Sequence, residues 1–224
     1  MPARGHFTPE LFRFINDLKK HNDRAWFEAN KPRYEQHVKA PLLAFIGDFG
    51  GKLPRFAPSY LADPRPVGGS MFRIYRDTRF AKDKSPYKTH ASAHFRHQLA
   101  TKNVHAPGFY LHLEPGASLC GVGMWHPEPE PLKLIRDRIV AKPKEWKAVR
   151  EAFEIEGDTL KRPPAGYDAA HPFIDDLKRK DFITSVSFKD AEVTRADFLE
   201  RFTEACQELA PLNRFLVQAV GLKW

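Results

Sequence analysis

HASAHFRH at residues 90–97 and GFYLHLEPG at residues 108–116 are the two segments that decide the fold class. In both, hydrophobic and polar residues alternate, and successive side chains of a β-strand point to opposite faces of a sheet. We therefore predict two strands that each have one buried face and one polar face. The predicted polar faces carry His90, Ser92, His94 and Arg96 from the first segment and Tyr110, His112 and Glu114 from the second.

Three further segments extend this sheet. MFRIYR at residues 71–76 has the same alternation, SLCGVGMW at residues 118–125 follows after a short connection, and residues 182–188 form a later strand. Parallel strands need long crossovers, whereas the successive strands in the middle of this chain are joined by short connections. The sequence therefore predicts an antiparallel meander.

Helical spacing of hydrophobic residues occurs before and after the strands. Residues 8–22 begin with Thr8 as the N-cap and Pro9 in the first turn, and residues 23–51 continue with helical spacing that two prolines interrupt. Further helices are predicted over residues 131–140, 143–154, 174–178 and 194–209, and another turn or two is expected after Pro211.

The predicted fold class is thus α+β, with an antiparallel sheet (a meander) and helices at the N-terminus and in the C-terminal half. We expect a single domain over residues 1–224. Its helical N-terminal part covers about 8–52, its sheet core about 71–126 and its α/β C-terminal part about 131–224.

Composition and hydropathy limit the class of protein. Hydrophobic residues make up 42% of the 224 residues, which is enough for a real core. The first thirty residues have no apolar leader-like segment, and no run approaches the roughly 18 apolar residues of a membrane span. We therefore expect a cytoplasmic protein with no membrane partner. Cys120 and Cys206 lack CxxC spacing, so we expect them to be reduced residues of the core. Trp125 and Trp146 fall at core-type spacing, so we expect them in the interior.

Positive charge is concentrated in one part of the chain. The net charge of the protein is +8, and residues 71–102 carry eight Lys or Arg against two Asp, so most of the net charge lies there. A focused positive field attracts phosphates, nucleic acid or acidic metabolites, whereas a solvated basic loop is the simpler interpretation. The eight basic residues are Arg73, Arg76, Arg79, Lys82, Lys84, Lys88, Arg96 and Lys102.

Three motifs carry a family resemblance. FRIYRDTRFAKDKSPYKTH at residues 72–90, with DRAWFEANKPRYE at 23–35 and LKRPPAGYDAAHPFIDDLKRK at 160–180, resembles a widespread family of microbial conserved proteins of unknown function. The resemblance covers nearly the whole chain in the same order, with small departures at Ala81 and at residues 21–23. It implies one domain, and it brings no established activity, cofactor or catalytic residue.

The basic motif supports two interpretations. In the first, Arg76 forms a structural ion-pair network with Asp77 or Asp83, because an unpaired charge directed toward the core is costly. In the second, two acids cannot neutralise six bases, so the remaining cations bind a phosphorylated or otherwise anionic small ligand. The candidate ligand-binding residues are Arg73, Arg76, Arg79, Lys82, Lys84 and Lys88, with Lys161 and Arg162 from the third motif.

Catalysis and metal binding have weaker support. Asp77 and His90 are candidate catalytic residues for phosphoryl transfer, but no nucleophile elbow, Ser/His/Asp order or Walker pattern supports an enzyme. His94 and His112 could approach His90 on the sheet, yet no carboxylate or thiolate clearly joins these histidines. We therefore predict neither a metal site nor a cofactor.

A nucleic-acid-binding module is the rival from another class of protein. The polar sheet face presents Tyr75, Tyr110, His94 and Arg96 beside a basic rim, an arrangement that stacks single-stranded bases in other proteins. No RNP, KH or helix-turn-helix pattern accompanies it. The oligomeric state and the identity of any ligand stay open at this level.

Overall fold

The computed structural model describes residues 5–100 and 106–224 and confirms the α+β fold class. Its sheet has five antiparallel strands in the order β1-β2-β3-β4-β5, so the predicted meander is confirmed, although a helical insertion separates β4 from β5. The single-domain organisation stays a prediction. The strands are β1 (Tyr60–Leu61), β2 (Ala91–His97), β3 (Gly108–Leu113), β4 (Ser118–Met124) and β5 (Phe182–Phe188).

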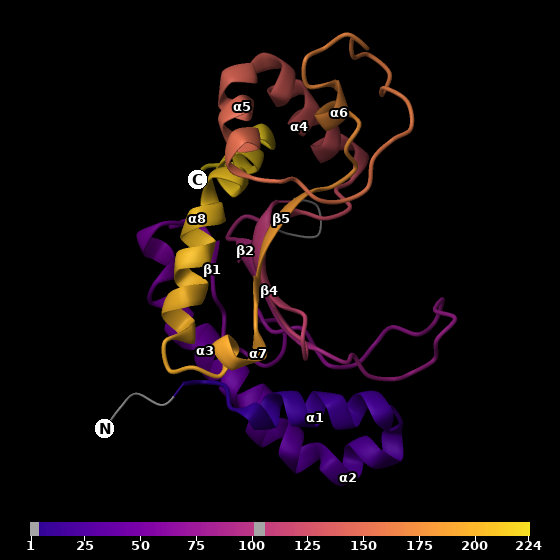
Figure 1. The fold of residues 1–224 in the computed structure, drawn as a ribbon, viewed down its shortest axis with the longest axis vertical. Coiled ribbons are helices and arrows are strands. Elements are labelled where there is room, and N and C mark those ends of the chain that lie inside the picture. The colour runs from indigo at the N-terminus through magenta and orange to yellow at the C-terminus, as the bar shows by residue number, and fades with distance from the viewer. Residues whose placement is uncertain (1–4, 101–105) are drawn as a thin grey trace.

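Helices cover one face and both ends of the sheet (Figure 1). Figure 1 shows α3 and α8 along one face, α1 and α2 at one end, and α4, α5 and α6 at the other. Within the described residues, none of the helices is both long enough and apolar enough to cross a lipid bilayer. Their bounds are α1 (Pro9–Lys20), α2 (Arg24–Tyr34), a π-helical segment (Glu35–Lys39), α3 (Ala40–Gly50), a 3-10 turn (Leu53–Arg55), α4 (Pro129–Ala141), α5 (Pro143–Ala152), α6 (Ile174–Leu177), α7 (Asp190–Val193) and α8 (Phe198–Ala219).

The hydrophobic core lies between the covered face of the sheet and α8, which packs against β4. Alternate residues of the strands point to this face, as the sequence pattern predicts. The Sγ atoms of Cys120 on β4 and Cys206 on α8 lie 3.5 Å apart, and both are buried free thiols. The fully buried side chains of this core include Phe95, Phe109, Leu111 and Phe182 from the sheet and Phe202 and Leu216 from α8. In the described part of the chain, no helix covers the opposite, open face of the sheet (Figure 1).

The last helix differs from the prediction. It was expected to end near Leu209, but α8 continues through Pro211 to Ala219. Proline removes one backbone donor from a helix, and this loss is tolerated here because Ala210 and Leu212 on either side of Pro211 are buried in the core. Packing therefore outweighs the local preference of proline.

The predicted strand at residues 71–76 is wrong. This segment forms isolated bridges only, Met71 with Ala93 and Tyr75 with Tyr87, rather than a continuous ladder. Beyond Tyr75, the backbone N–H of Arg76 donates to the Pro86 carbonyl at 2.9 Å, but Pro86 has no N–H to donate in return. The ladder cannot extend past this point, and residues 77–85 form a long loop that projects on the open side of the sheet (Figure 1).

Candidate functional site

The open face of the sheet is built from three rows of side chains. The strand register places Arg96, Gly108, Gly123 and Ile183 in one row. It places His94, Tyr110, Gly121 and Ser185 in the next, and Ser92, His112, Leu119 and Ser187 in the third. Alternation therefore brings the predicted polar residues of β2 and β3 onto one face, as expected.

Glycines hollow out the centre of this face. A Cβ atom on Gly108 would overlap the His94 ring, and Gly123 has a φ of 121°, where a side chain would overlap the Phe182 carbonyl. These two positions require glycine for steric reasons. At Gly121 an added Cβ meets its nearest neighbour, the Leu119 side chain, at 3.5 Å, which is ordinary contact. Gly121 therefore leaves a space that a side chain could occupy.

A cavity of about 870 Å³ occupies the space over these glycines. This volume is typical of a site for a small molecule. Its walls combine apolar and aromatic surface with a few polar and charged groups. They include Phe72, Lys88, His90, Ser92, His94, Arg96, Tyr110, Leu119, Trp125, His126, Glu156, Ile183 and Ser185.

Lys88 is the half-buried cation of the cavity wall. Its ammonium lies 5.0 Å from the centre of the Phe72 ring. Burial, and secondly the charge of Arg73, lower the pKa of Lys88. Arg96, by contrast, is exposed and donates to the Gly68 carbonyl at 3.0 Å. Within the described residues, no carboxylate forms an ion pair with Lys88.

The two histidines of β2 and its N-terminal end are neutral at physiological pH. Burial, followed by the charges of His112 and Lys88, lowers the pKa of His90 to about 4. Burial, and secondly the charge of Arg96, lowers the pKa of His94 to about 4. The Phe72 ring lies 6.3 Å from the His94 ring and nearly parallel to it. Both histidines thus present uncharged imidazoles to the cavity.

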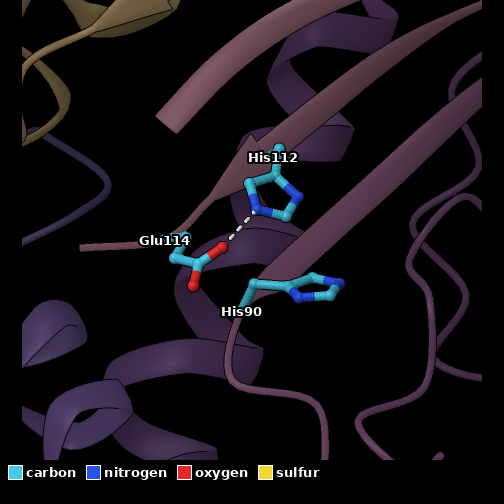
Figure 2. Close-up of side chains that lie close together, drawn as sticks. All are labelled: His90, His112 and Glu114. Carbon is cyan, nitrogen blue, oxygen red and sulfur yellow. Dashed lines mark hydrogen bonds and ion pairs between the residues drawn. The ribbon is translucent and has the colours of Figure 1, made fainter. Parts of the chain in front are cut away.

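His112 of β3 and Glu114, which directly follows β3, form a hydrogen-bonded pair at the edge of the cavity. The Nε2 atom of His112 lies 3.0 Å from Oε2 of Glu114, and its Nδ1 atom lies 3.0 Å from the Tyr110 hydroxyl. The His90 ring lies 4.4 Å from the His112 ring, measured between ring centres. Figure 2 shows the Glu114 carboxylate facing His112, with His90 beside them.

His126 and Asp181 form a second polar pair, which the sequence prediction missed. Oδ1 of Asp181 accepts from the backbone N–H of His126 at 2.6 Å and lies 2.7 Å from its Nδ1 atom. Oδ2 accepts from the Asp158 N–H at 2.9 Å. Burial alone raises the pKa of Asp181, but these hydrogen bonds and the nearby imidazole lower it overall. The only signal in the sequence is a histidine directly after a strand, because its partner lies 55 residues away.

His126 is also held in an uncommon backbone conformation. Its φ is 50°, in the left-handed region that few residues other than glycine adopt. The neighbouring Trp125 stacks on its ring with 4.2 Å between ring centres, and both residues line the cavity. The expectation that Trp125 lies in the interior is wrong, since it is 71% exposed, whereas Trp146 is fully buried as expected.

The charged side chains of the basic loop at residues 77–85, and of Arg76 before it, interact mainly within this segment. Arg79 forms a two-pronged ion pair with Asp77, with its Nη2 atom 2.7 Å from Oδ2, and this pair lowers the pKa of Asp77 to about 2. Arg76 pairs with Asp83, whose pKa is lowered mainly by hydrogen bonds from Ser85 and Arg76. Lys84 donates to the Thr78 carbonyl at 2.9 Å. Arg73 and Lys82 are exposed.

The structure thus separates the predicted site residues into different places. Lys88 and His90 line the large cavity, whereas Arg76 lines a smaller pocket of about 290 Å³ between α2 and the loop. Asp77, Arg79 and Lys84 belong to the loop network. Lys161 and Arg162 are exposed on a separate loop before α6. Lys102, which was counted in the basic segment, lies outside the described residues.

Comparisons with known proteins place the chain in a family. The family described as Conserved hypothetical protein (DUF2461) matches residues 10–215, and the chain belongs to it. A search of the curated proteins finds no match. The family description states no activity, so any function has to be argued from the site.

Proposed function

We propose that this member of the conserved hypothetical family binds a small organic anion with an apolar or aromatic body in the cavity on the open face of the sheet. The observation that carries the proposal is the position of Lys88, a half-buried cation without a carboxylate partner in the described chain, on the wall of a cavity of about 870 Å³. A carboxylate or phosphate group on the ligand would supply the missing counter-charge.

The anionic group is expected at the Lys88 end of the cavity. A partly buried ammonium loses hydration, so it gains from an anion that is sequestered beside it. The neutral imidazole of His90, two residues further along the chain, is a hydrogen-bond donor or acceptor for the same group. Arg96 is a less suitable anchor because it is exposed and already donates to Gly68.

The apolar body of the ligand is expected over the centre of the sheet. The Phe72 ring lies 6.3 Å from the Tyr110 ring, and both adjoin the hollow over Gly121. Aromatic walls and a glycine floor accept a flat group by stacking and apolar contact. A simple inorganic anion would leave this surface unused, so we expect organic anions to bind more tightly than inorganic phosphate.

The predicted anion-binding role of the basic loop becomes a secondary part of this proposal. Arg73, Arg79, Lys82 and Lys84 are all exposed, and they would attract an anion from a distance rather than hold it. Arg76, Lys161 and Arg162 lie outside the cavity wall and contribute only to this field. Their effect should weaken with salt, because exposed charges are screened beyond about 10 Å at 0.1 M ionic strength.

Titration with anilinonaphthalene sulfonate, a fluorescent aromatic anion, tests the proposal. We expect saturable binding to the folded protein, and a loss of affinity of at least about tenfold in Lys88→Met, which removes the charge and keeps the length of the side chain. Organic carboxylates and phosphate esters that displace the probe would then identify the ligand class.

Lys82→Met is the matched control. It removes the same charge from an exposed position of the loop, so it should leave the dissociation constant of the probe nearly unchanged. Equal affinity of wild type and Lys88→Met would contradict the proposal, because the probe would then bind elsewhere.

Binding of single-stranded nucleic acid is the second candidate, and the aromatic open face favours it. Phe72, Tyr110 and Trp125 all lie on the cavity wall, where bases could stack. This function predicts retention of labelled DNA or RNA oligonucleotides at low salt and a steep loss of affinity as salt rises. Absence of oligonucleotide binding together with probe binding would leave the small-anion proposal alone.

A further inference from the structure

We propose that His90, His112 and Glu114 form a binding site for a first-row divalent transition metal at the edge of the cavity. One ligand atom from each residue lies within 4.8 Å of the other two. Two imidazoles and one carboxylate are a ligand set that such metals favour. The sequence prediction rejected a metal because it found no carboxylate beside the histidines, and the sheet supplies Glu114.

The strand register explains why these residues meet. His112 lies on β3 and Glu114 follows the last residue of that strand, two positions further along, so both side chains lie on the same side of the sheet. Ala91 pairs with Leu113, which places His90, just before β2, opposite Glu114. The fold therefore holds the three side chains together through backbone pairing, without relying on a flexible loop.

Small side-chain movements would complete the coordination. In a tetrahedral zinc site with bonds of about 2.1 Å, the ligand atoms lie about 3.4 Å apart. The His112 and Glu114 atoms, 3.0 Å apart, are already near this separation. In the view of Figure 2 the His90 ring extends away from Glu114, so rotation of this one side chain is the main adjustment.

The surroundings of His112 suit a metal ligand. Ligating histidines commonly have their second ring nitrogen held by a hydrogen bond, which fixes the tautomer and the ring orientation. Here Nδ1 of His112 lies 3.0 Å from the Tyr110 hydroxyl. When a metal replaces the proton that Nε2 shares with Glu114, the proton on Nδ1 donates to the Tyr110 hydroxyl and the lone pair of Nε2 binds the metal.

Three protein ligands leave positions on the metal open, and His90 also lines the cavity. Open positions are the property of metal sites that bind a further ligand, whereas structural zinc sites are closed by four protein ligands. Lys88 stands two residues before His90 and would repel the cation. It would also hold an anion that coordinates the metal from the cavity side.

Metal titration of the full chain, purified without an affinity tag and stripped with a chelator, tests this site. Calorimetry with Zn²⁺ should give one ion per chain, and Co²⁺ should give the visible absorption of a low coordination number. Mg²⁺ should bind much more weakly, because it prefers oxygen ligands and octahedral geometry.

Variants locate the bound ion. Glu114→Gln and His112→Ala should each lower the Zn²⁺ affinity by more than about 100-fold, and Tyr110→Phe by about 10-fold, because it removes only the supporting hydrogen bond. His94→Gln is the matched control, since it removes an imidazole from the same sheet face outside the triad, and it should keep the wild-type affinity. Glu114→Gln preserves size and hydrogen bonding if His112→Ala does not fold.

The outcomes separate this proposal from the anion proposal. Lys88→Met should keep or strengthen Zn²⁺ binding, because it removes a repulsive charge, while it weakens binding of the aromatic anion. Absence of Zn²⁺ and Co²⁺ binding in the wild type overturns the metal site. So does wild-type affinity in both Glu114→Gln and His112→Ala, which would place the ion elsewhere.

Discussion

The basic loop and the open face of the sheet differ in how their polar groups are satisfied. In the loop, Arg79 pairs with Asp77 and Arg76 with Asp83, and Lys84 binds a loop carbonyl. On the sheet face, Lys88 has no carboxylate partner among the described residues, and the neutral histidines line a hollow. The charged groups of the basic loop thus interact mainly with one another, whereas Lys88 and the histidines of the sheet face can interact with a ligand.

Of the predictions, the largest change in stability is expected when Asp181 is replaced, and Asp77 serves as the comparison. Asp181 is 1% exposed and accepts three hydrogen bonds, so Asp181→Ala should lower the free energy of unfolding by about 3 kcal/mol. Urea denaturation measures this change. Asp77→Ala, its counterpart in the exposed loop, should leave the unfolding midpoint almost unchanged. Similar losses in both variants would mean that the loop is as important to stability as the end of the sheet.

Acid should destabilise the protein through His94. Burial lowers the pKa of His94 to about 4 in the folded state, below the ordinary value of about 6.5, so the unfolded chain takes up the proton first. Stability should therefore fall as the pH drops from about 6.5 to about 4, by roughly 3 kcal/mol from this residue, and level off below that.

Urea unfolding at a series of pH values measures this effect. His94→Gln removes the titrating group and should show a shallower loss of stability in this pH range than the wild type. His21→Gln is the control, because His21 is exposed at the end of α1, away from the sheet. An unchanged pH dependence in His94→Gln would show that the cavity wall is more hydrated than its burial indicates.

Filling the cavity should weaken binding of the anion probe with little loss of stability. Gly121→Val places a side chain into the space over the sheet, where its Cβ atom meets the nearest neighbour at 3.5 Å, and valine favours strands. We expect the aromatic anion probe to bind at least about tenfold more weakly, or about 1.4 kcal/mol. Fluorescence titration measures the affinity, and thermal unfolding should confirm that the fold is retained.

Ser187→Val is the matched control for this cavity-filling variant. It adds the same side chain to the same face of the sheet, on β5, at an exposed position outside the cavity wall. Probe affinity equal to that of the wild type is expected there. If Gly121→Val also binds normally, the cavity over Gly121 is not where the anion binds.

Removing the ion pair between Arg79 and Asp77 in the basic loop should have the smallest effect on stability and binding. In Arg79→Ala, Asp77 loses its partner, but both residues are exposed and water can replace the ion pair. We expect no measurable change in melting temperature and no change in probe affinity at physiological salt. A clear loss of affinity there would transfer the binding role from the sheet back to the loop.

Local sequence patterns were sufficient for most of the fold. Alternation in residues 90–97 and 108–116 predicts both strands and their polar face, and β5 has the predicted bounds at residues 182–188. The failures occur where distant contacts decide. Pro211 should end a helix, but the buried residues around it keep α8 continuous, and the pairing of Tyr75 with Tyr87 cannot extend past Arg76 because Pro86, ten residues further on, has no N–H.

The sequence by itself determined the α+β class, the two-faced sheet and the concentration of positive charge, because these depend on residue order and on local periodicity. Only the tertiary structure decided which cations find partners and where a cavity opens. His126 contacts Asp181, which lies 55 residues later in the chain. His90, just before β2, lies near Glu114, just after β3. Such pairs arise from strand register and packing between segments that are remote in the chain, which no local pattern encodes.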